Sequence, residues 1–382
     1  MKILVYSHDA SFYGATKAIF ELTNELRAEH NIKYVIPTHG MLEKKLYEYN
    51  YEYVISNNPS WLVPDRKSDY SRWNFIKHCV KTWLTFNNAI KSECKRNIDI
   101  IGCNRPDLII VNTSVAPLGI YVAKKLDIPC ILWIHETICN KNGWYVPTFF
   151  SKMRVGHVLN KANIIMGPSK FLKDYVEKAF HISKMQILPN MIDYNPKYTN
   201  DNVKYLFGIV ASISERKGQV EFLESMIKYM PNANVVMYGS GENDYSLKLQ
   251  SIIAEYPYNA ELRGFENDLD VIYSSFDIYV NMGVDETFGR TTIEAMRAGK
   301  LVFGRRSGAT VEHITHGYNG FLFDDVKDIF SILQEYDSYE GQRKIAEIRQ
   351  RGREYSMKYE PNMVTKKFMS IINEKLNYKV WE

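Results

Sequence analysis

Short runs of apolar and β-branched residues alternate with amphipathic stretches along the first half of the chain. The runs predict strands at residues 3–6, 34–37, 108–112, 130–134, 163–166 and 186–188. One helical face is traced after the first strand by Ala15, Ala18, Ile19, Leu22 and Leu26. Residues 115–126 predict a further helix. Strands that alternate with helices in this way predict a parallel sheet with helices on both faces.

The same kind of pattern restarts after a polar stretch at residues 195–202. It predicts strands at residues 204–211, 234–238 and 276–281, and helices at residues 219–230 and 291–298. We therefore predict an α/β fold with two doubly wound domains, residues 1–192 and 203–358, joined by a linker near residues 191–203. Ligands of such sheets bind beyond the carboxyl ends of the strands, which are expected to face each other across a cleft.

The bulk composition is that of an ordinary globular protein. The chain has 382 residues, of which 45% are hydrophobic and 24% charged, and a net charge of +4 gives no argument for a nucleic-acid partner. No apolar run approaches the roughly 20 residues that a membrane span needs. The first residues read as a strand and not as a secretory signal. Five cysteines without paired spacing predict reduced thiols and a cytoplasmic location.

The segment from Asp285 to Met296 carries the clearest chemical signal. Glu286 and Glu294 bracket Gly289, where a loop is predicted to become a helix. A helix start offers unpaired N–H groups and a partial positive charge, which favour a phosphate. Glu286 would precede this anion site and Glu294 would lie about two turns inside the helix. A nucleotide-sugar presents a diphosphate between two hydroxyl-rich rings; the alternative is a helix with ordinary acidic residues.

Two cations follow the first predicted strand of the second domain. Arg216 and Lys217 precede Gly218, where the next helix opens. This places them at the carboxyl end of the same sheet, within reach of a diphosphate. Charge-assisted hydrogen bonds from such groups contribute roughly 1.5–3 kcal/mol each. A solvated surface pair is the alternative.

The first domain contributes a glycine turn and a histidine. Gly14 and Ala15 open the first helix, where backbone can approach a ligand closely. The turn lacks the full G-x-G-x-x-G spacing of a dinucleotide site. His135 follows a strand and fits a polar contact with a ligand. A structural glycine and a histidine bonded to backbone groups are the alternatives.

Together these segments resemble the retaining glycosyltransferases of family 4, most strongly between about residues 208 and 320. The motifs that carry the resemblance appear in order: Lys217-Gly218, Gly239-Ser240-Gly241, Glu286 to Glu294, the turn at Gly299, Ser307-Gly308-Ala309 and Glu312. The resemblance implies the GT-B fold, which has two facing Rossmann-like domains. It also implies that a final helix, beginning at Pro361 within residues 360–382, crosses back onto the first domain.

The resemblance implies three catalytic residues. Glu286 would face the transferred sugar, Lys217 would neutralise the leaving diphosphate, and His135 would touch a sugar hydroxyl near the reacting carbon. Glu294 would accept hydrogen bonds from the ribose. The remaining implied donor-binding residues are Gly14, Ala15, Arg216, Gly239, Phe265, Phe288, Gly289, Arg290 and Thr291.

The implied reaction is a hexosyl transfer with retention at the anomeric carbon. A nucleotide-sugar, with a UDP-sugar favoured, would be the donor, and a glycan or lipid-linked saccharide the acceptor, as in bacterial surface polysaccharide synthesis. No metal or other cofactor is expected, because cations and a helix terminus stabilise the leaving group. The family usually carries an arginine where this chain has Ala211-Ser212, and Arg216 is our candidate replacement. The aspartates at 268 and 270 are interpreted as part of a surface helix start, not a metal motif.

Residues 70–97 form a long amphipathic stretch with basic and aromatic residues. Apolar residues recur at helical spacing at Trp73, Ile76, Val80, Trp83, Ile90 and Cys94, and Lys or Arg residues surround them. Such a segment can attach reversibly to an anionic membrane at about 1 kcal/mol per basic residue, with Phe75 and Phe86 in the interface. A domain helix with a solvated basic face is the alternative.

Two other functional classes stay open. A catalytically silent GT-B relative would bind a glycan or a partner protein, and the departure at Ala211 keeps this possibility. An unrelated two-domain Rossmann enzyme is disfavoured by the incomplete dinucleotide fingerprint. Donor turnover separates the first class from an enzyme, and nicotinamide or flavin binding would support the second.

Overall fold

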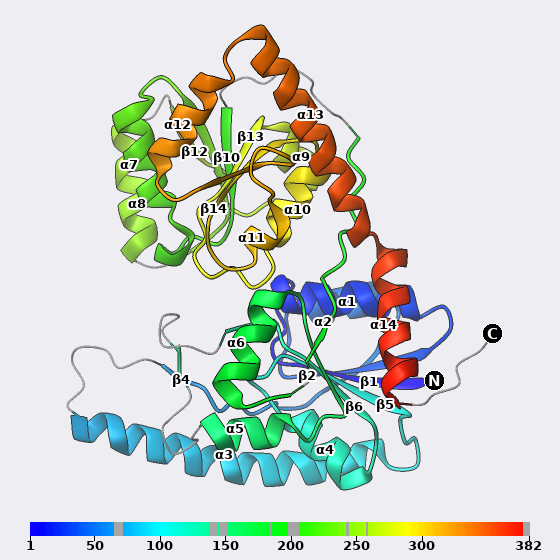
Figure 1. Ribbon diagram of the computed structural model, residues 1–382. Helices are drawn as coiled ribbons and strands as arrows, with labels where there is room; N and C mark the ends of the chain where they lie inside the picture. Colours follow the sequence, from blue (N-terminus) through cyan, green and yellow to red (C-terminus); the bar gives the residue numbers. More distant parts are fainter. Residues whose placement is uncertain are drawn as a thin grey trace. The chain divides into compact units, whose positions relative to one another are not determined.

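The computed structural model describes residues 1–64, 72–137, 144–145, 152–183, 185–197, 206–241, 244–256 and 259–376. The chain divides into two compact units, Met1–Met191 with Pro361–Glu382, and Ile192–Glu360 (Figure 1). Each unit is built around its own parallel β-sheet. The two units are called unit 1 and unit 2 below.

Unit 1 contains a seven-stranded sheet in the order β3-β2-β1-β5-β6-β8-β9, and all neighbours are parallel. Its strands are β1 (Lys2–Ser7), β2 (Asn31–Ile36), β3 (Glu52–Ile55), β5 (Leu108–Asn112), β6 (Cys130–Trp133), β8 (Ile164–Gly167) and β9 (Gln186–Ile187). A separate antiparallel pair joins β4 (Val63–Pro64) to β7 (Trp144–Tyr145). The order reverses between β1 and β5, which creates a topological switch point at that edge.

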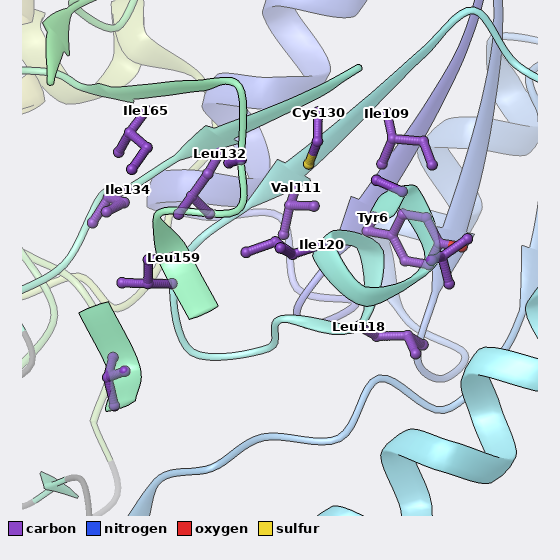
Figure 2. Packing of buried hydrophobic residues seen from close by; sticks show 14 of the residues in the cluster. Tyr6, Ile109, Val111, Leu118, Ile120, Cys130, Leu132, Ile134, Leu159 and Ile165 are labelled. Carbon is purple, nitrogen blue, oxygen red and sulfur yellow. The ribbon is translucent and has the colours of Figure 1, made fainter. Parts of the chain in front are cut away.

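Helices cover both faces of the unit 1 sheet. They are α1 (Gly14–Leu26), α2 (Met41–Glu48), α3 (Arg72–Ile101), α4 (Leu118–Leu126), α5 (Lys152–Leu159), α6 (Lys170–Phe180) and α14 (Pro361–Leu376). Successive strand residues point to opposite faces. Tyr6 and Val111 therefore pack against Leu118 and Ile120 of α4 (Figure 2). Val5 and Ile110 lie in the other core, with α1 and α14.

The predicted final helix is confirmed within unit 1. The core that contains α1 also buries the apolar face of α14, which consists of Val364, Phe368, Ile371 and Ile372. Pro361 is its first residue, where a missing N–H costs no hydrogen bond. The chain thus returns to unit 1 after completing unit 2.

Unit 2 contains a six-stranded parallel sheet in the order β12-β11-β10-β13-β14-β15. Its strands are β10 (Leu206–Val210), β11 (Asn234–Tyr238), β12 (Ala260–Leu262), β13 (Ile278–Asn281), β14 (Leu301–Arg305) and β15 (Phe321–Phe323). The order reverses between β10 and β13. The carboxyl ends of these two neighbours therefore border the switch point of this unit.

The helices of unit 2 also lie on both faces of its sheet (Figure 1). They are η2 (Glu215–Lys217), α7 (Gln219–Tyr229), α8 (Asp244–Glu255), α9 (Leu269–Ser274), α10 (Arg290–Arg297), α11 (Thr310–His313), α12 (Val326–Glu335), α13 (Tyr339–Ser356) and η3 (Met357–Tyr359), of which η2 and η3 are 3-10 helices. One core packs α7 and α12 on the sheet, and the other packs α9 and α10.

The nine predicted strands are confirmed, with ends that shift by up to three residues. The predicted helix at residues 115–126 begins later, at Leu118, because Pro117 occupies its N-cap. Four strands of the two parallel sheets, β3, β12, β14 and β15, were not predicted. They have three to five residues each, and β3, β12 and β14 each contain a charged residue that interrupts the apolar run.

The amphipathic stretch at residues 70–97 belongs to the single long helix α3. One expectation about it is wrong: Phe86 is buried, at 3% exposure, against Trp61 and the core. Ile90 and Cys94 are buried as well, whereas Trp73 is 72% exposed. The carboxyl half of α3 is therefore mainly a domain helix, and among the described residues most of its exposed large apolar side chains lie in the amino half. The side chain of Phe75 lies outside the described residues.

The four described cysteines, Cys79, Cys94, Cys103 and Cys130, are free thiols, and Cys139 lies outside the described residues. Across the described part of the chain, we find no helix whose length and apolar character would allow it to cross a membrane.

Candidate active site

The loops at the switch point of unit 2 bring together most of the predicted donor-binding residues. The 3-10 helix η2 follows β10, the loop at residues 282–289 follows β13, and the loop at residues 306–309 follows β14. Because β10, β13 and β14 are neighbours in the sheet, these three loops lie at one edge. This is the position where doubly wound sheets bind their ligands.

Glu286 and Lys217 form an ion pair at this edge, with side chains that are only 12% and 16% exposed. Burial would raise the pKa of the Glu286 carboxyl. The Lys217 ammonium and the nearby Arg216 charge outweigh burial and hold this pKa below its ordinary value. The structure therefore places Arg216 and Lys217 at the carboxyl end of the sheet, as predicted, and beside an ionised carboxylate.

Two glycines allow the Glu286 loop to close tightly. A Cβ on Gly308, where φ is +58°, would lie 2.4 Å from the Glu286 nitrogen. A Cβ on Gly283 would lie 2.3 Å from the Glu286 Oε1. The Glu286 carbonyl also accepts a hydrogen bond from the Ala309 N–H at 2.7 Å. Backbone packing and not only charge thus fixes this carboxylate.

Helix α10 begins one residue after Gly289, whose φ of +78° lies in the left-handed region. Glu294 is the fifth residue of α10 and lies little more than one turn inside it, so the expected depth of two turns is wrong. Helix α10 begins at Arg290, close to the predicted residue 291, so only the four residues from Arg290 to Ile293 precede Glu294 in the helix. Glu294 is 3% exposed.

Arg290 and Tyr273 hold the Glu294 carboxylate. The Arg290 Nε donates to Oε1 at 2.7 Å, and the Tyr273 hydroxyl donates to Oε2 at 3.0 Å. The Thr291 hydroxyl is paired at 2.6 Å with the hydroxyl of Tyr279. The side chains of Arg290 and Thr291, at the start of α10, are therefore already bonded within unit 2. A ligand would have to share or replace these contacts.

Phe288 contributes backbone and core packing. Its side chain is buried between the rings of His313 and Tyr359, with centroids 5.1 and 5.5 Å away. Its carbonyl accepts a hydrogen bond from the His313 Nε2. The neighbouring Gly289 leaves its own N–H without a partner among the described residues.

Gly239 and Phe265 follow the neighbouring strands β11 and β12. A Cβ on Gly239, where φ is +144°, would lie 1.8 Å from the Ala211 carbonyl oxygen. This close approach explains why a glycine is needed there, independently of any ligand. The Phe265 side chain is 47% exposed beyond β12. At Ala211, where the family usually has an arginine, the backbone carbonyl packs closely against Gly239.

In unit 1, Gly14 and Ala15 begin α1, and the Ala15 carbonyl accepts a hydrogen bond from the Asn112 Nδ2 at 3.0 Å. Gly14 has a φ of +43°, and a Cβ added there would meet no atom within 4 Å, so only its backbone angle favours glycine. These residues follow β1, whose carboxyl end borders the switch point.

His135 follows β6 and is 9% exposed. Its Nε2 is buried without a hydrogen-bond partner among the described residues, and its ring lies against Trp133. Within the part of the chain that the structure describes, no backbone group satisfies Nε2, contrary to the alternative. Burial, aided by the charge of His8, lowers the pKa of His135 to about 3, so the ring is neutral at physiological pH.

Sequence reasoning missed several polar residues at these edges. Glu136 accepts hydrogen bonds from the Ser114 N–H at 2.7 Å and hydroxyl at 2.6 Å, and burial raises its pKa. In unit 2, Asn281 donates to the Thr292 hydroxyl at 2.9 Å. The available signal was a polar residue at the end of a predicted strand, as for Asn281, or within two residues after it, as for Glu136.

The aspartates at 268 and 270 have structural roles. Asp268 is the N-cap of α9, where its carboxylate accepts hydrogen bonds from two backbone N–H groups. Asp270 accepts a hydrogen bond from the Tyr194 hydroxyl at 3.2 Å. The interpretation of this pair as a helix start is confirmed.

Comparison with known families assigns both halves of the chain. Residues 12–195 match the family described as Glycosyltransferase Family 4, and residues 191–356 match the family described as Glycosyl transferases group 1. The sulfoquinovosyl transferase SQD2 of Arabidopsis thaliana is 26% identical over 326 residues, which cover 78% of this chain and 60% of that enzyme. The alpha-monoglucosyldiacylglycerol synthase of Acholeplasma laidlawii is 24% identical over 328 residues, 76% of this chain and 78% of that enzyme.

Solved structures share the fold over almost the whole chain. Alr3699/HepE of Anabaena, in complex with UDP and glucose, superposes with a TM-score of 0.75 at 17% identity, covering 98% of this chain and 99% of that one. A glycosyltransferase of Rickettsia africae superposes with a TM-score of 0.77 at 17% identity and covers 99% of both chains. With consecutive matches from residue 12 to residue 356 and two Rossmann-like units, the chain belongs to the family 4 glycosyltransferases.

Proposed function

We propose that the protein is a retaining hexosyltransferase that moves a sugar from a nucleotide-sugar, UDP-linked by preference, to a glycan or lipid-linked acceptor. One observation carries the proposal: the partly buried carboxylate of Glu286 and the buried carboxylate of Glu294 flank the start of α10 at the switch point of unit 2. The solved relative in complex with UDP and glucose supports the choice of donor. Synthesis of bacterial surface polysaccharide or glycoconjugate is the proposed setting.

The donor site follows from the positions of these groups. Glu294 accepts hydrogen bonds from the ribose hydroxyls, and the N–H groups at Gly289 and Arg290 bind the diphosphate at the helix start. Glu286 faces the transferred sugar. Lys217 and Arg216 carry the positive charge that neutralises the diphosphate, so no metal ion is required.

The reaction breaks the bond between the anomeric carbon and the diphosphate oxygen. The acceptor hydroxyl attacks on the same face, and the departing diphosphate takes its proton, so charge and atoms balance without an external base. Lys217 shifts part of its interaction from Glu286 to the growing negative charge on the leaving group. Electrostatic stabilisation of this kind is commonly the largest catalytic contribution.

The remaining candidates contribute around the donor. His135, with a neutral ring and an unpaired Nε2, is the proposed contact of unit 1 with a sugar hydroxyl. The backbone at Gly14 and Ala15 is a second proposed donor contact of unit 1. Gly239 and Phe265 border it from the loops after β11 and β12.

A thermal-shift screen tests the donor assignment. UDP, GDP, ADP and dTDP are added to the purified protein with and without magnesium, and we expect UDP to raise the melting temperature in both conditions. Glu294→Gln should abolish the shift, whereas the matched control Glu255→Gln, on an exposed part of α8, should retain it. No shift with any nucleoside diphosphate would contradict the proposal.

A catalytically silent relative is the alternative, and donor hydrolysis distinguishes it. Release of UDP from UDP-glucose, lost in Glu286→Ala, supports an enzyme. Binding of UDP without turnover of any donor, with or without an added saccharide acceptor, would favour the binding protein.

We further propose that α3 attaches reversibly to an anionic membrane. Trp73, Ile76, Val80 and Leu84 form an exposed apolar stripe at helical spacing, with exposures of 72, 36, 36 and 50%. Lys77 and Lys81 are exposed beside it, and no acidic residue lies between Arg72 and Leu84. A relative named as an alpha-monoglucosyldiacylglycerol synthase supports a lipid acceptor at such a surface.

Flotation tests the membrane contact. Vesicles that contain phosphatidylglycerol should carry the protein upward at low salt and release it at high salt. Trp73→Ala with Leu84→Ala should reduce flotation, whereas Tyr339→Ala, which removes a side chain that is 91% exposed elsewhere, should not. Wild-type protein that stays with the unbound fraction at low salt would remove this part of the proposal.

A further inference from the structure

A buried histidine lies directly behind the proposed diphosphate site of unit 2. His313 ends α11 and is 3% exposed. Its Nε2 contacts the Phe288 carbonyl oxygen, and its Nδ1 lies 3.1 Å from the Tyr359 hydroxyl. None of these groups is at the surface where a ligand would bind.

The partners determine which nitrogen of His313 carries the proton. A carbonyl oxygen can only accept, so Nε2 must donate to Phe288. Nδ1 is then unprotonated and accepts a hydrogen bond. Two hydroxyls lie near Nδ1, those of Tyr355 at 3.2 Å and Tyr359 at 3.1 Å. The Tyr355 hydroxyl donates its one proton to the Glu312 carbonyl at 3.0 Å, so the Tyr359 hydroxyl is the donor to Nδ1. Burial lowers the pKa of His313 to about 4, which keeps the ring neutral.

The hydrogen bond from His313 to the Phe288 carbonyl also fixes the direction of the Gly289 N–H. A peptide unit is planar and trans, so its C=O and N–H point in opposite directions. The Phe288 carbonyl and the Gly289 N–H belong to one peptide unit. Since the carbonyl points into the core towards His313, the Gly289 N–H points away from the core, and it has no partner among the described residues.

The peptide between Glu286 and Thr287, earlier in the same loop, also has its carbonyl held by a hydrogen bond. The Glu286 carbonyl accepts a hydrogen bond from the Ala309 N–H at 2.7 Å, which turns the following N–H away from that contact. Alternate carbonyls of the loop are thus anchored by residues after β14.

We infer that His313 is a positioning residue, which aims the Gly289 N–H at the diphosphate of the donor. The inference rests on the proposed function and names a residue for which the family resemblance gives no role. Without the imidazole, the peptide between Phe288 and Gly289 is free to rotate, because the left-handed conformation at Gly289 has no side chain to oppose other angles. The N–H would then lose its fixed direction.

Packing alone is the competing explanation. The His313 ring contacts Phe288 and Tyr359 edge to face, with centroids 5.1 and 5.7 Å apart, and an apolar side chain could fill this space. A packing role predicts that all ligands of unit 2 are affected alike. A positioning role predicts that only the diphosphate is affected.

Isothermal titration of His313→Gln and His313→Leu distinguishes the two roles, with UDP and uridine as probes. The Gln amide can donate where Nε2 does, whereas Leu cannot. We expect His313→Leu to weaken UDP binding about tenfold, which is the effect of roughly one lost charge-assisted hydrogen bond. Uridine affinity should stay the same, and His313→Gln should bind UDP within about threefold of wild type.

The outcomes separate this inference from the proposed function. Wild-type protein that binds no nucleoside diphosphate would refute the proposed function itself. Wild-type binding together with unchanged UDP affinity in folded His313→Leu, or an equal loss for UDP and uridine, would refute only the positioning role. If His313→Leu does not fold, His313→Phe keeps a ring against Phe288 and Tyr359 but cannot donate to the Phe288 carbonyl, and unchanged UDP affinity in that variant would refute the role.

Discussion

The two units share a doubly wound architecture but differ in how the polar groups at their strand ends are satisfied. In unit 2, Glu286 pairs with Lys217, and Glu294 is held by Arg290 and Tyr273. In unit 1, the His8 Nδ1, the Thr113 Oγ1 and the His135 Nε2 are buried with no partner among the described residues. Unit 2 also leaves the Gln219 Oε1, the Arg305 Nε and the Thr310 Oγ1 in that state, but both of its site carboxylates are bonded. Thr113 also has a φ of +95°, which is costly for a β-branched residue.

This difference indicates how each edge is prepared for a ligand. Buried polar groups are nearly always hydrogen-bonded, and the exceptions often mark functional positions. The charges of unit 2 neutralise one another before any donor arrives, so a donor must exchange partners with them. The edge of unit 1 has unmet hydrogen-bonding capacity, which a hydroxyl-rich ligand can fill.

The largest expected effect is in unit 2, where the ion pair should stabilise the unliganded protein. Lys217→Met leaves the Glu286 carboxylate buried and unpaired, which should cost about 3 kcal/mol of unfolding free energy. Chemical denaturation measures this loss. Adding Glu286→Gln to Lys217→Met should recover most of it, because no charge then remains unpaired. If Lys217→Met alone is as stable as wild type, the ion pair contributes nothing to the unfolding free energy of the unliganded protein.

The opposite result is expected at the edge of unit 1. His135→Leu removes a buried polar atom that has no partner among the described residues, so stability at pH 7 should be unchanged or higher. Transfer activity should fall at least about tenfold if the ring binds a sugar hydroxyl. Denaturation and a transfer assay on the same preparation test both. Lower stability with unchanged activity would reverse the contrast between the units.

The same variant has a defined pH dependence. The pKa of His135 is about 3 in the folded protein, below the ordinary value of 6.5, so the unfolded chain binds more protons between these values. Wild-type stability relative to His135→Leu should therefore fall as the pH falls below 6.5. At pH 5 the relative loss should reach about 2 kcal/mol. A difference that stays constant between pH 7 and pH 5 would contradict a buried, neutral ring.

The smallest expected effect compares the two glycines at helix starts. Gly14 and Gly289 have positive φ values of +43° and +78°, and a Cβ would meet no close contact at either position. Alanine at each should therefore cost only about 1 kcal/mol of stability through backbone strain. UDP affinity should fall in Gly289→Ala more than in Gly14→Ala, because the Gly289 peptide borders the diphosphate. Equal affinities would weaken the assignment of the anion site.

The sequence predicts much of the fold because the relevant signals are local. The strands β5 and β11 lie where continuous apolar runs place them, at residues 108–112 and 234–238. Helix α14 begins at the predicted proline. Strands such as β15, with three residues, give no periodic signal and become visible only through their pairing with β14.

Candidate site residues are also accessible from the sequence, whereas their contacts are not. Glu286, Glu294 and Lys217 stand out by spacing and by the family resemblance. Their pairing is not predictable, because Lys217 and Glu286 are 69 positions apart and meet only through the order of strands. Phe86 is expected at a membrane and lies instead in the core, since helical spacing does not say which face a domain covers.

The sequence by itself thus determined the two Rossmann-like units, the order of their elements and the residue types at the strand ends, because hydrophobic periodicity acts over a few residues. Tertiary structure alone decided which charges neutralise each other, which polar atoms of the described residues are buried without partners, and that His313 holds the Phe288 carbonyl. The physical reason is that burial and hydrogen bonding depend on segments that the sheet brings together. The free energy of each polar contact in turn depends on how far its surroundings exclude water.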